Sequence, residues 1–146
     1  RSADLFHFMG AQSTPLAVQQ ALSGTYDKVL GSTRVINENG VPGGAVSSVA
    51  INVSVGRLTS YSFSGTDGQG RSFSGCAFAC SVGSVSLPDF AKNGVVLGPG
   101  SSLDGGPAIG RAQGVAVGPT GHGIISSFDL KNAGRQAVTG SFVVKR

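Results

Sequence analysis

Charged side chains are scarce in this chain: they make up 12% of its 146 residues, against about 25% in an average protein. Serine and threonine provide most of the polar surface instead. The net charge is +4, and the lysines and arginines are scattered singly, with Lys145-Arg146 as the one adjacent pair. Nucleic-acid-binding proteins usually carry a basic stripe with aromatic side chains for stacking. Neither is visible here, so we predict no nucleic-acid partner.

Long hydrophobic runs are also missing. No stretch approaches the roughly 18 consecutive apolar residues of a membrane-spanning helix, and none resembles a signal peptide. The chain begins with Arg1 rather than Met, which indicates a mature product or an excised fragment. We predict no membrane-spanning segment. The neutral, hydroxyl-rich composition favours an exported protein, placed at the cell surface, in the periplasm or outside the cell.

The motifs of common enzyme classes are absent as well. The chain has seven carboxylates and two histidines, and none of its serines lies in the glycine-flanked strand-to-helix turn that exposes a hydrolase nucleophile. The glycine-rich stretch 94–106 lacks the Lys-Ser/Thr ending and the following helix of a phosphate-binding loop. We therefore predict that the protein is not an enzyme.

The only two cysteines are Cys76 and Cys80. In an extended strand, residues four apart are about 13 Å from each other, whereas a disulfide needs Cα atoms within about 7 Å. A bridge therefore requires residues 77–79 to form a tight loop. We favour a Cys76–Cys80 disulfide, which implies an oxidising compartment, over two free thiols. The spacing fits neither a thioredoxin-type site nor a zinc site.

Glycine is plentiful, at 24 residues, and it separates short segments in which apolar and polar side chains alternate. The clearest segment is 46–55, where Val49, Ile51, Val53 and Val55 share one face, as in a half-buried antiparallel strand. Gly56 joins it to a second alternating segment at 57–64, which predicts a hairpin. The glycines are interpreted as turn and bulge positions.

Further alternating segments follow along the chain. Residues 110–118 and 124–130 predict another hairpin, and Val138, Phe142 and Val144 lie on one side of the closing segment. Residues 16–22 and 89–92 are the two short stretches with helical character, and 98–107 is the longest span without a predicted element. We predict one all-β domain over residues 1–146, an antiparallel up-and-down β-barrel of about eight strands with glycine-rich turns. Residues 1–22 are a candidate N-terminal strand or extension.

His7 and Met9 raise the question of a cofactor, because a His/Met pair can ligate haem iron. Two residues apart on a predicted strand, they lie on one face and cannot sit on opposite sides of one iron. A Cys-x-x-Cys-His attachment site is also missing. We predict no cofactor, with haem as the less favoured alternative.

Phe78 and His122 are the two candidate partner contacts. Phe78 lies inside the predicted disulfide loop, where a constrained apolar tip suits a protein contact; the alternative is a ring turned inward against the core. His122 lies between Gly121 and Gly123 in a predicted hairpin turn, where it is either solvated or in contact with a ligand or partner.

Several short glycine-led segments carry a family resemblance, and together they cover most of the chain from residue 22 onward. They are Leu22-Ser-Gly-Thr-Tyr26, the 45–55 strand with Tyr61-Ser-Phe-Ser-Gly65, Ser72-Phe-Ser-Gly75, the stretch 110–119 and Val138-Thr-Gly-Ser-Phe-Val-Val-Lys145. In this order they resemble the small C-terminal β-barrel of FecR-like bacterial envelope proteins, which is similar in style to the barrels of transferrin-binding-protein-type surface lipoproteins. The resemblance implies an exported eight-stranded barrel without catalytic activity. Nothing here resembles the N-terminal FecR segment, so iron signalling is not implied.

Two functions follow as hypotheses. The first is an exported binding module that recognises a protein, or a small ligand, through barrel-end loops such as 65–70 and 98–110, because side chains fill the interior of a small barrel. The second is a structural subunit of an extracellular assembly, which self-associates through the apolar stretch Leu5–Met9 as an added strand or through the barrel wall.

Overall fold

The computed structural model describes residues 13–33 and 35–146, and nearly all of their regular structure is antiparallel β-sheet. The predicted all-β class is therefore confirmed. The strands are β1 (Gly24–Tyr26), β2 (Lys28–Ser32), β3 (Val35–Asn37), β4 (Pro42–Ser54), β5 (Arg57–Asp67), β6 (Ser72–Cys76), β7 (Val85–Ser86), β8 (Val95–Leu97), β9 (Ser102–Leu103), β10 (Gly106–Val117), β11 (Gly123–Asn132) and β12 (Ala137–Lys145). The helices are α2 (Leu16–Ala21), α3 (Leu87–Lys92) and the 3₁₀ turn η1 (Phe78–Cys80).

Eight of these strands pair in a ring. Strands β3, β4, β5, β6, β9, β10, β11 and β12 each pair with the next one in this order, which skips β7 and β8, and β12 pairs back with β3. The four remaining strands are short and extend the edges: β1 pairs with β4, β2 with β12, β7 with β5 and β8 with β10. The chain is thus an up-and-down meander whose last strand meets an early one.

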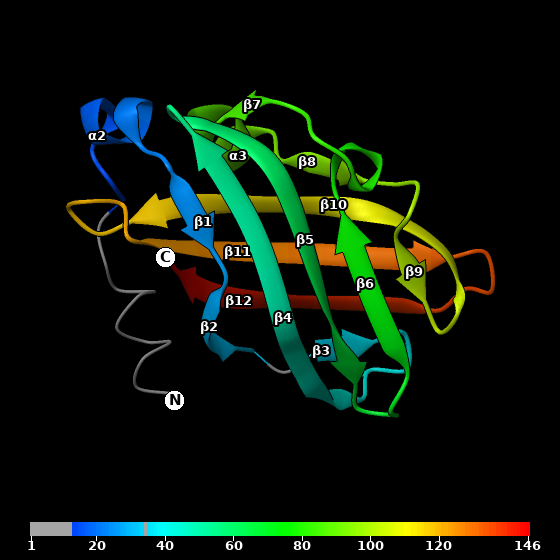
Figure 1. Cartoon of the computed structure of the whole chain (residues 1–146). Coiled ribbons are helices and arrows are strands. Elements are labelled where there is room, and N and C mark those ends of the chain that lie inside the picture. Colours follow the sequence, from blue (N-terminus) through cyan, green and yellow to red (C-terminus); the bar gives the residue numbers. More distant parts are fainter. Residues whose placement is uncertain (1–12, 34) are drawn as a thin grey trace.

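The ring has two walls that cross each other (Figure 1). Strands β1, β4, β5 and β6 form the front wall in this view, and β10, β11 and β12 form the back wall. Both walls turn their apolar faces inward onto a common hydrophobic cluster. Its large rings stack edge to face or tilted against one another, and they belong to Tyr61, Phe63, Phe73, Phe90, Phe128 and Phe142.

The β4–β5 hairpin confirms the alternation in the sequence with one correction. Val49, Ile51 and Val53 are buried, as predicted, but Val55 is 70% exposed. β4 ends at Ser54, and Val55 and Gly56 form the turn with φ angles of 45° and 77°. A two-residue turn with positive φ at both positions matches the twist of the flanking strands. The backbone at Val55 therefore leaves the pleat, and its side chain leaves the apolar face.

The stretch 98–107, predicted to have no element, contains β9. This two-residue strand closes the gap between the walls, because Ser102 pairs with Ser74 of β6 and also with Pro107 of β10. Its sequence shows only two alternating residues, which is too short a pattern for periodicity to detect. The pairing depends on both neighbours being in place.

Some glycines lie inside strands and not in turns. A Cβ on Gly75 would lie 2.5 Å from the Phe63 ring, and one on Gly114 would lie 2.7 Å from the Phe90 ring. These glycines give the aromatic rings room to lie flat against the opposite backbone. These glycines serve the packing of the core, whereas the sequence predicted glycine only at turns and bulges.

Both short helices close the top of the ring in Figure 1. Ser86 caps the start of α3, because its hydroxyl accepts a hydrogen bond from the Asp89 amide, and the helix buries Leu87 and Phe90 in the core. α2 occupies the stretch with helical character and lies against the Gly56 turn, where a Cβ would contact Gln20. None of the helices in the described residues is long and apolar enough to cross a membrane.

Candidate functional site

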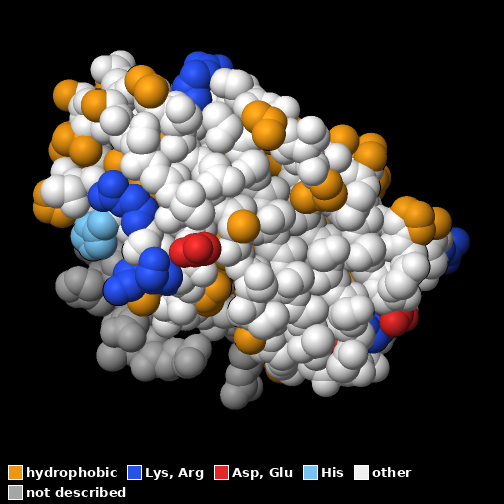
Figure 2. All heavy atoms as spheres, viewed as in Figure 1, with side chains coloured by type: hydrophobic (Ala, Val, Ile, Leu, Met, Phe, Trp, Pro, Cys, Tyr) orange, Lys and Arg blue, Asp and Glu red, His pale blue; other side chains and the backbone are white. Residues whose placement is uncertain are grey.

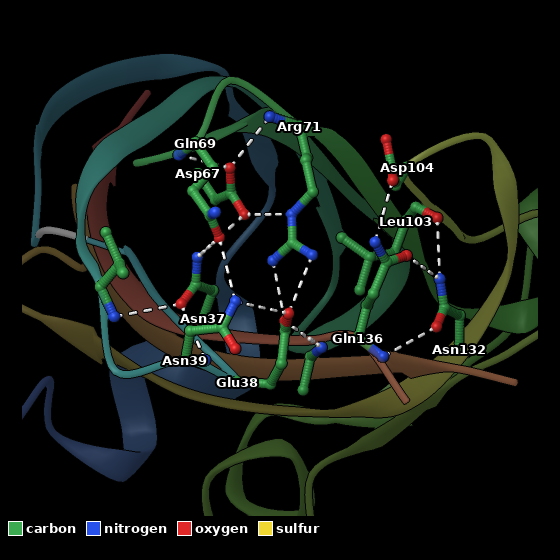
Figure 3. A network of polar contacts seen from close by, with 12 residues as sticks. Asn37, Glu38, Asn39, Asp67, Gln69, Arg71, Leu103, Asp104, Asn132 and Gln136 are labelled. Atoms are coloured by element: carbon green, nitrogen blue, oxygen red, sulfur yellow. Dashed lines mark hydrogen bonds and ion pairs between the residues drawn. The ribbon is translucent and has the colours of Figure 1, made fainter. Parts of the chain in front are cut away.

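Four turns that lie far apart in the sequence are tied together at one end of the ring by polar side chains (Figure 3). They are the turns that join β3 to β4, β5 to β6, β9 to β10 and β11 to β12. We call this set of side chains the polar clasp; its members are Asn37, Glu38, Asn39, Asp67, Gln69, Arg71, Asp104, Asn132 and Gln136.

Arg71 is the centre of the polar clasp. Its Nη1 and Nη2 donate to the two carboxylate oxygens of Glu38 at 3.0 and 2.8 Å, and its Nε donates to Asp67 at 2.7 Å. This forked geometry uses the planar guanidinium fully. Glu38 lies in the β3–β4 turn, and Asp67 and Arg71 flank the β5–β6 turn, so one cation joins two hairpins.

Asp67 also shapes its own turn. Its side chain is fully buried, and its Oδ1 accepts hydrogen bonds from the backbone amides of Gln69 and Arg71, both at 2.9 Å. Asn37 donates to the Gln69 side chain at 2.6 Å and thereby adds a second link to the β3–β4 turn. An aspartate that accepts from amides two and four residues ahead is a common device for fixing a tight turn.

The other two turns are attached by amide side chains. Asn132 Nδ2 donates to the Leu103 carbonyl at 3.1 Å, and Gln136 Nε2 donates to Asp104 at 2.9 Å. The Ala137 amide donates to Glu38 at 3.0 Å, so the start of β12 joins the Arg71 group. All four turns therefore belong to one connected set of hydrogen bonds.

The clasp keeps its carboxylates ionised. The hydrogen bond from Arg71, with a further one from the Ala137 amide, lowers the pKa of Glu38 to about 2. Burial alone would raise the pKa of Asp67, but hydrogen bonds from the Arg71 side chain and from the turn amides outweigh it and lower that pKa. The two carboxylates in turn raise the pKa of Arg71. Groups held in their charged forms are poor proton donors near neutral pH, so this arrangement suits positioning and not acid catalysis.

A shallow apolar hollow lies next to the clasp. It has a volume of about 350 Å³ and is lined by Pro107, Ile109, Lys131, Asn132 and Ala133. Ile109 is 59% exposed, which is high for a large aliphatic side chain on a strand. Asn132 belongs both to the hollow and to the clasp, so the hydrogen bonds of the clasp hold one edge of the hollow in place.

The predicted disulfide between Cys76 and Cys80 is present, with Cα atoms 5.0 Å apart. Phe78, Ala79 and Cys80 all have φ near 57°, so the loop is a left-handed turn of three non-glycine residues. Phe78 is half-buried, packs against the core cluster and lies over Gly83. Inward packing, which was the alternative, describes this ring better than an exposed tip.

Of the two histidines, only His122 lies in the described part of the chain. His122 lies in the β10–β11 turn, its ring lies over Gly118, and its Nδ1 is 3.4 Å from the Thr120 hydroxyl. Its carbonyl accepts the Arg146 amide at 3.1 Å. A partner contact at His122 stays a prediction. His7, Met9 and the rest of the Leu5–Met9 stretch lie outside the described residues. Among the residues that are described, no group of three or more His, Cys, Asp or Glu side chains could hold a metal ion.

Sequence reasoning located the loops of the clasp but not its side chains. The candidate loops 65–70 and 98–110 both contribute to this end, through Asp67, Gln69 and Asp104. The sequence signal that could have found these side chains was an acidic residue in each of two predicted turns, Glu38 and Asp67, with Arg71 directly after the second turn. Glu38 and Arg71 are 33 residues apart, however, and only the strand pairing brings them together.

No protein-family model, curated protein or solved structure matches this chain.

Proposed function

We propose that this protein is an exported, non-enzymatic binding module that contacts a protein partner through the clasped end of the ring. The observation that carries the proposal is that an exposed apolar hollow, lined in part by Ile109, lies beside turns that hydrogen bonds already hold together. Loops held in place lose little conformational entropy on binding, and a central apolar contact with a polar rim is the usual composition of a protein interface.

The closed barrel is part of this proposal. Eight strands that pair in a ring around aromatic side chains support a barrel whose interior is filled. Ligands would then bind at the outer surface or at the ends. The Cys76–Cys80 disulfide supports an oxidising compartment, such as the bacterial periplasm or cell surface that the FecR-like resemblance implies.

A photo-crosslinking experiment in the native cell tests the proposal. A photoreactive amino acid replaces Ile109 in one strain and Val55, which is 70% exposed in the β4–β5 turn at the opposite end of the ring, in the control strain. We expect a discrete heavier adduct from position 109 and none from position 55. The variant Ile109→Glu should abolish the adduct of a nearby second probe at Ala133 without a change in melting temperature. Equal adducts from both strains would contradict the proposal.

The second candidate, a subunit of an assembly, is favoured by the front wall. Strands β4 and β6 carry no charged residue. A row of four serines runs in register across β4, β5 and β6 to the neighbouring β9: Ser48, Ser64, Ser74 and Ser102. The wall is accordingly almost free of charged side chains in Figure 2. A second copy could pack on it without burying a charge.

Light scattering distinguishes the two candidates. If the protein is a subunit of an assembly, we expect a mass above that of one chain. The double variant Ser64→Arg, Ser74→Arg should then be a monomer. A monomer at all accessible concentrations would exclude wall-to-wall assembly and leave the binding module.

A further inference from the structure

The two cysteines of the disulfide differ in exposure. Cys76 ends β6 and is 5% exposed, whereas Cys80 is an exposed residue. Both line a shallow hollow of about 280 Å³ on the front wall, together with uncharged side chains such as Ser62 and Ser74. A disulfide is opened by a thiolate that attacks one of its sulfurs, so access decides which sulfur is attacked. Cys80 is the cysteine that an external thiol reaches.

The loop that joins the cysteines holds an unfavourable backbone conformation. Phe78, Ala79 and Cys80 have φ angles of 57°, 56° and 59°. Residues with a Cβ adopt this left-handed conformation rarely, and then singly, whereas here it is repeated three times without a glycine. Opening of the disulfide releases the loop from it. Strained or exposed disulfides are the ones that exchange most readily with other thiols.

The buried sulfur has partners that suit a leaving group. Ser101 is 3% exposed, and its hydroxyl oxygen lies 3.9 Å from Cys76 Sγ. A hydroxyl that donates to a departing thiolate favours its charged form. The Pro99 carbonyl oxygen lies 3.7 Å from the same sulfur, where it can accept a hydrogen bond from the thiol once that thiol is protonated.

The disulfide lies beside the narrowest seam of the ring (Figure 1). β6 is joined to β10 through β9, which forms only two residue pairs with each of them. The turn that precedes β9 rests on the disulfide, because a Cβ on Gly100 would lie 2.2 Å from Cys80 Sγ. In the same turn, the Ser101 hydroxyl accepts a hydrogen bond from the Cys76 amide at 3.0 Å. The sulfur bridge therefore helps to hold β9 in place.

We propose that Cys80 is a thiol–disulfide exchange site through which an external dithiol loosens the β6–β9 seam. One thiolate of the dithiol attacks Cys80 Sγ and forms a mixed disulfide, and the electron pair of the broken S–S bond leaves with Cys76, which takes a proton from water. The second thiolate of the dithiol then attacks its neighbour in the mixed disulfide and releases Cys80 as a thiolate. The dithiol is oxidised to a disulfide, and the two cysteines are reduced by two electrons. This exchange does not depend on the proposed partner contact at the clasped end.

Trapping of the mixed disulfide identifies the attacked sulfur. The native protein is incubated with reduced glutathione, a monothiol, and the reaction is stopped with acid before the remaining thiols are alkylated. Tandem mass spectrometry then locates each group within the peptide. We expect about tenfold more glutathione on Cys80 than on Cys76. No adduct, or an adduct shared equally or mainly on Cys76, would overturn the proposal.

The left-handed loop is tested at equilibrium in a buffer of dithiol and cyclic disulfide. Ala79→Gly removes the Cβ from the middle of the loop and should lower the equilibrium constant for reduction by about threefold, because glycine adopts the left-handed conformation without strain. Ala91→Gly is the matched control, since Ala91 is exposed in α3, and it should leave the constant unchanged. The same constant in both variants, or a higher one for Ala79→Gly, would contradict the proposal.

Hydrogen exchange of the native protein tests whether the seam loosens. The Asp104 amide donates to the Ser72 carbonyl at 2.8 Å, and the Ala108 amide donates to the Ser101 carbonyl at 3.0 Å. Both amides should exchange about tenfold faster after reduction, because local opening exposes them, while amides in the β11–β12 pairing keep their rates. Unchanged rates at Asp104 and Ala108, or an equal acceleration throughout the sheet, would overturn the proposal.

Discussion

The two ends of the eight-strand ring are closed by different interactions. At the clasped end, Arg71 holds Glu38 and Asp67, and charged and amide side chains carry nearly all the links between turns. At the opposite end, side chains donate mainly to backbone carbonyls: Tyr26 to Gly121 and Thr14 to Gly118. Helix α3 covers that end with the buried side chains of Leu87 and Phe90, and α2 lies at the same end (Figure 1).

The two ends therefore differ in how accessible their turns are. Ionic hydrogen bonds hold exposed turns in place without covering them, so the clasped end remains accessible. Helical packing buries the turns it stabilises. The end that is both ordered and open is the one that we propose contacts a partner.

The largest expected effect comes from removing the central cation. Arg71→Met leaves the buried Asp67 carboxylate without its ionic partner, and the expected loss in unfolding free energy is about 3 kcal/mol. Urea denaturation measures it. Arg57→Met is the matched control, because Arg57 is exposed at the opposite end and its side chain bonds only to Ser84 among the hydrogen bonds described. It should change stability by less than about 0.5 kcal/mol. Similar losses in both variants would remove the distinction between the ends.

The disulfide loop should give the next largest effect. Cys76→Ser, Cys80→Ser opens a five-residue loop, for which chain entropy predicts a loss of about 2 kcal/mol. Release of the left-handed backbone at Phe78, Ala79 and Cys80 offsets part of that loss. Comparison of urea midpoints with and without reductant in the native chain provides the check. A reduced protein as stable as the oxidised one would mean that the strained turn cancels the cross-link.

A smaller effect is expected at the packed end. Tyr26→Phe removes the hydroxyl that donates to the Gly121 carbonyl and should cost about 1 kcal/mol. The pKa of Tyr26 is raised by burial, against the opposing charge of Arg146, so the hydroxyl stays protonated at neutral pH and the loss should not vary between pH 5 and 8. Thermal unfolding at three pH values within that range measures both points. A pH-dependent loss would mean that charge, and not this neutral hydrogen bond, closes the end.

The smallest expected effect is the pH dependence of the clasp. Glu38 and Asp67 have pKa values below those of an unfolded chain, so their contribution is complete above about pH 4.5 and is lost as the pH falls toward 2. Solvent screening at the partly exposed Glu38 keeps its share small. Melting temperatures from pH 7 to 2 should fall less steeply in Arg71→Met than in the native protein. Parallel curves would show that the acid sensitivity arises elsewhere.

The strands themselves were largely predictable. Alternation of small polar and apolar residues located β4, β5, β10, β11 and β12, and the turn at Gly56 located the first hairpin. The two incorrect predictions have the same cause. Val55 continues the alternation in sequence but lies in the turn, and β9 is two residues long, so a pattern of period two could not distinguish either from its surroundings.

The candidate site was less predictable than the fold. The disulfide could be anticipated because its two cysteines are the only ones in the chain and are close in sequence. The apolar hollow could not, because Pro107 and Ile109 approach Lys131 and Ala133 only through the β10–β11 pairing. Ile109 alone is one more aliphatic residue in an alternating strand.

By itself, the sequence determined the local chemistry: which residues alternate, where glycine permits a turn, and which two sulfurs can meet. These properties depend on neighbours a few positions away, and they survive in any arrangement of the strands. The tertiary structure alone decided that Arg71 meets Glu38 and that four distant turns share one set of hydrogen bonds. The hydrogen bonds between these turns join residues from 29 to 99 positions apart, and only the register of the paired strands brings them within bonding distance.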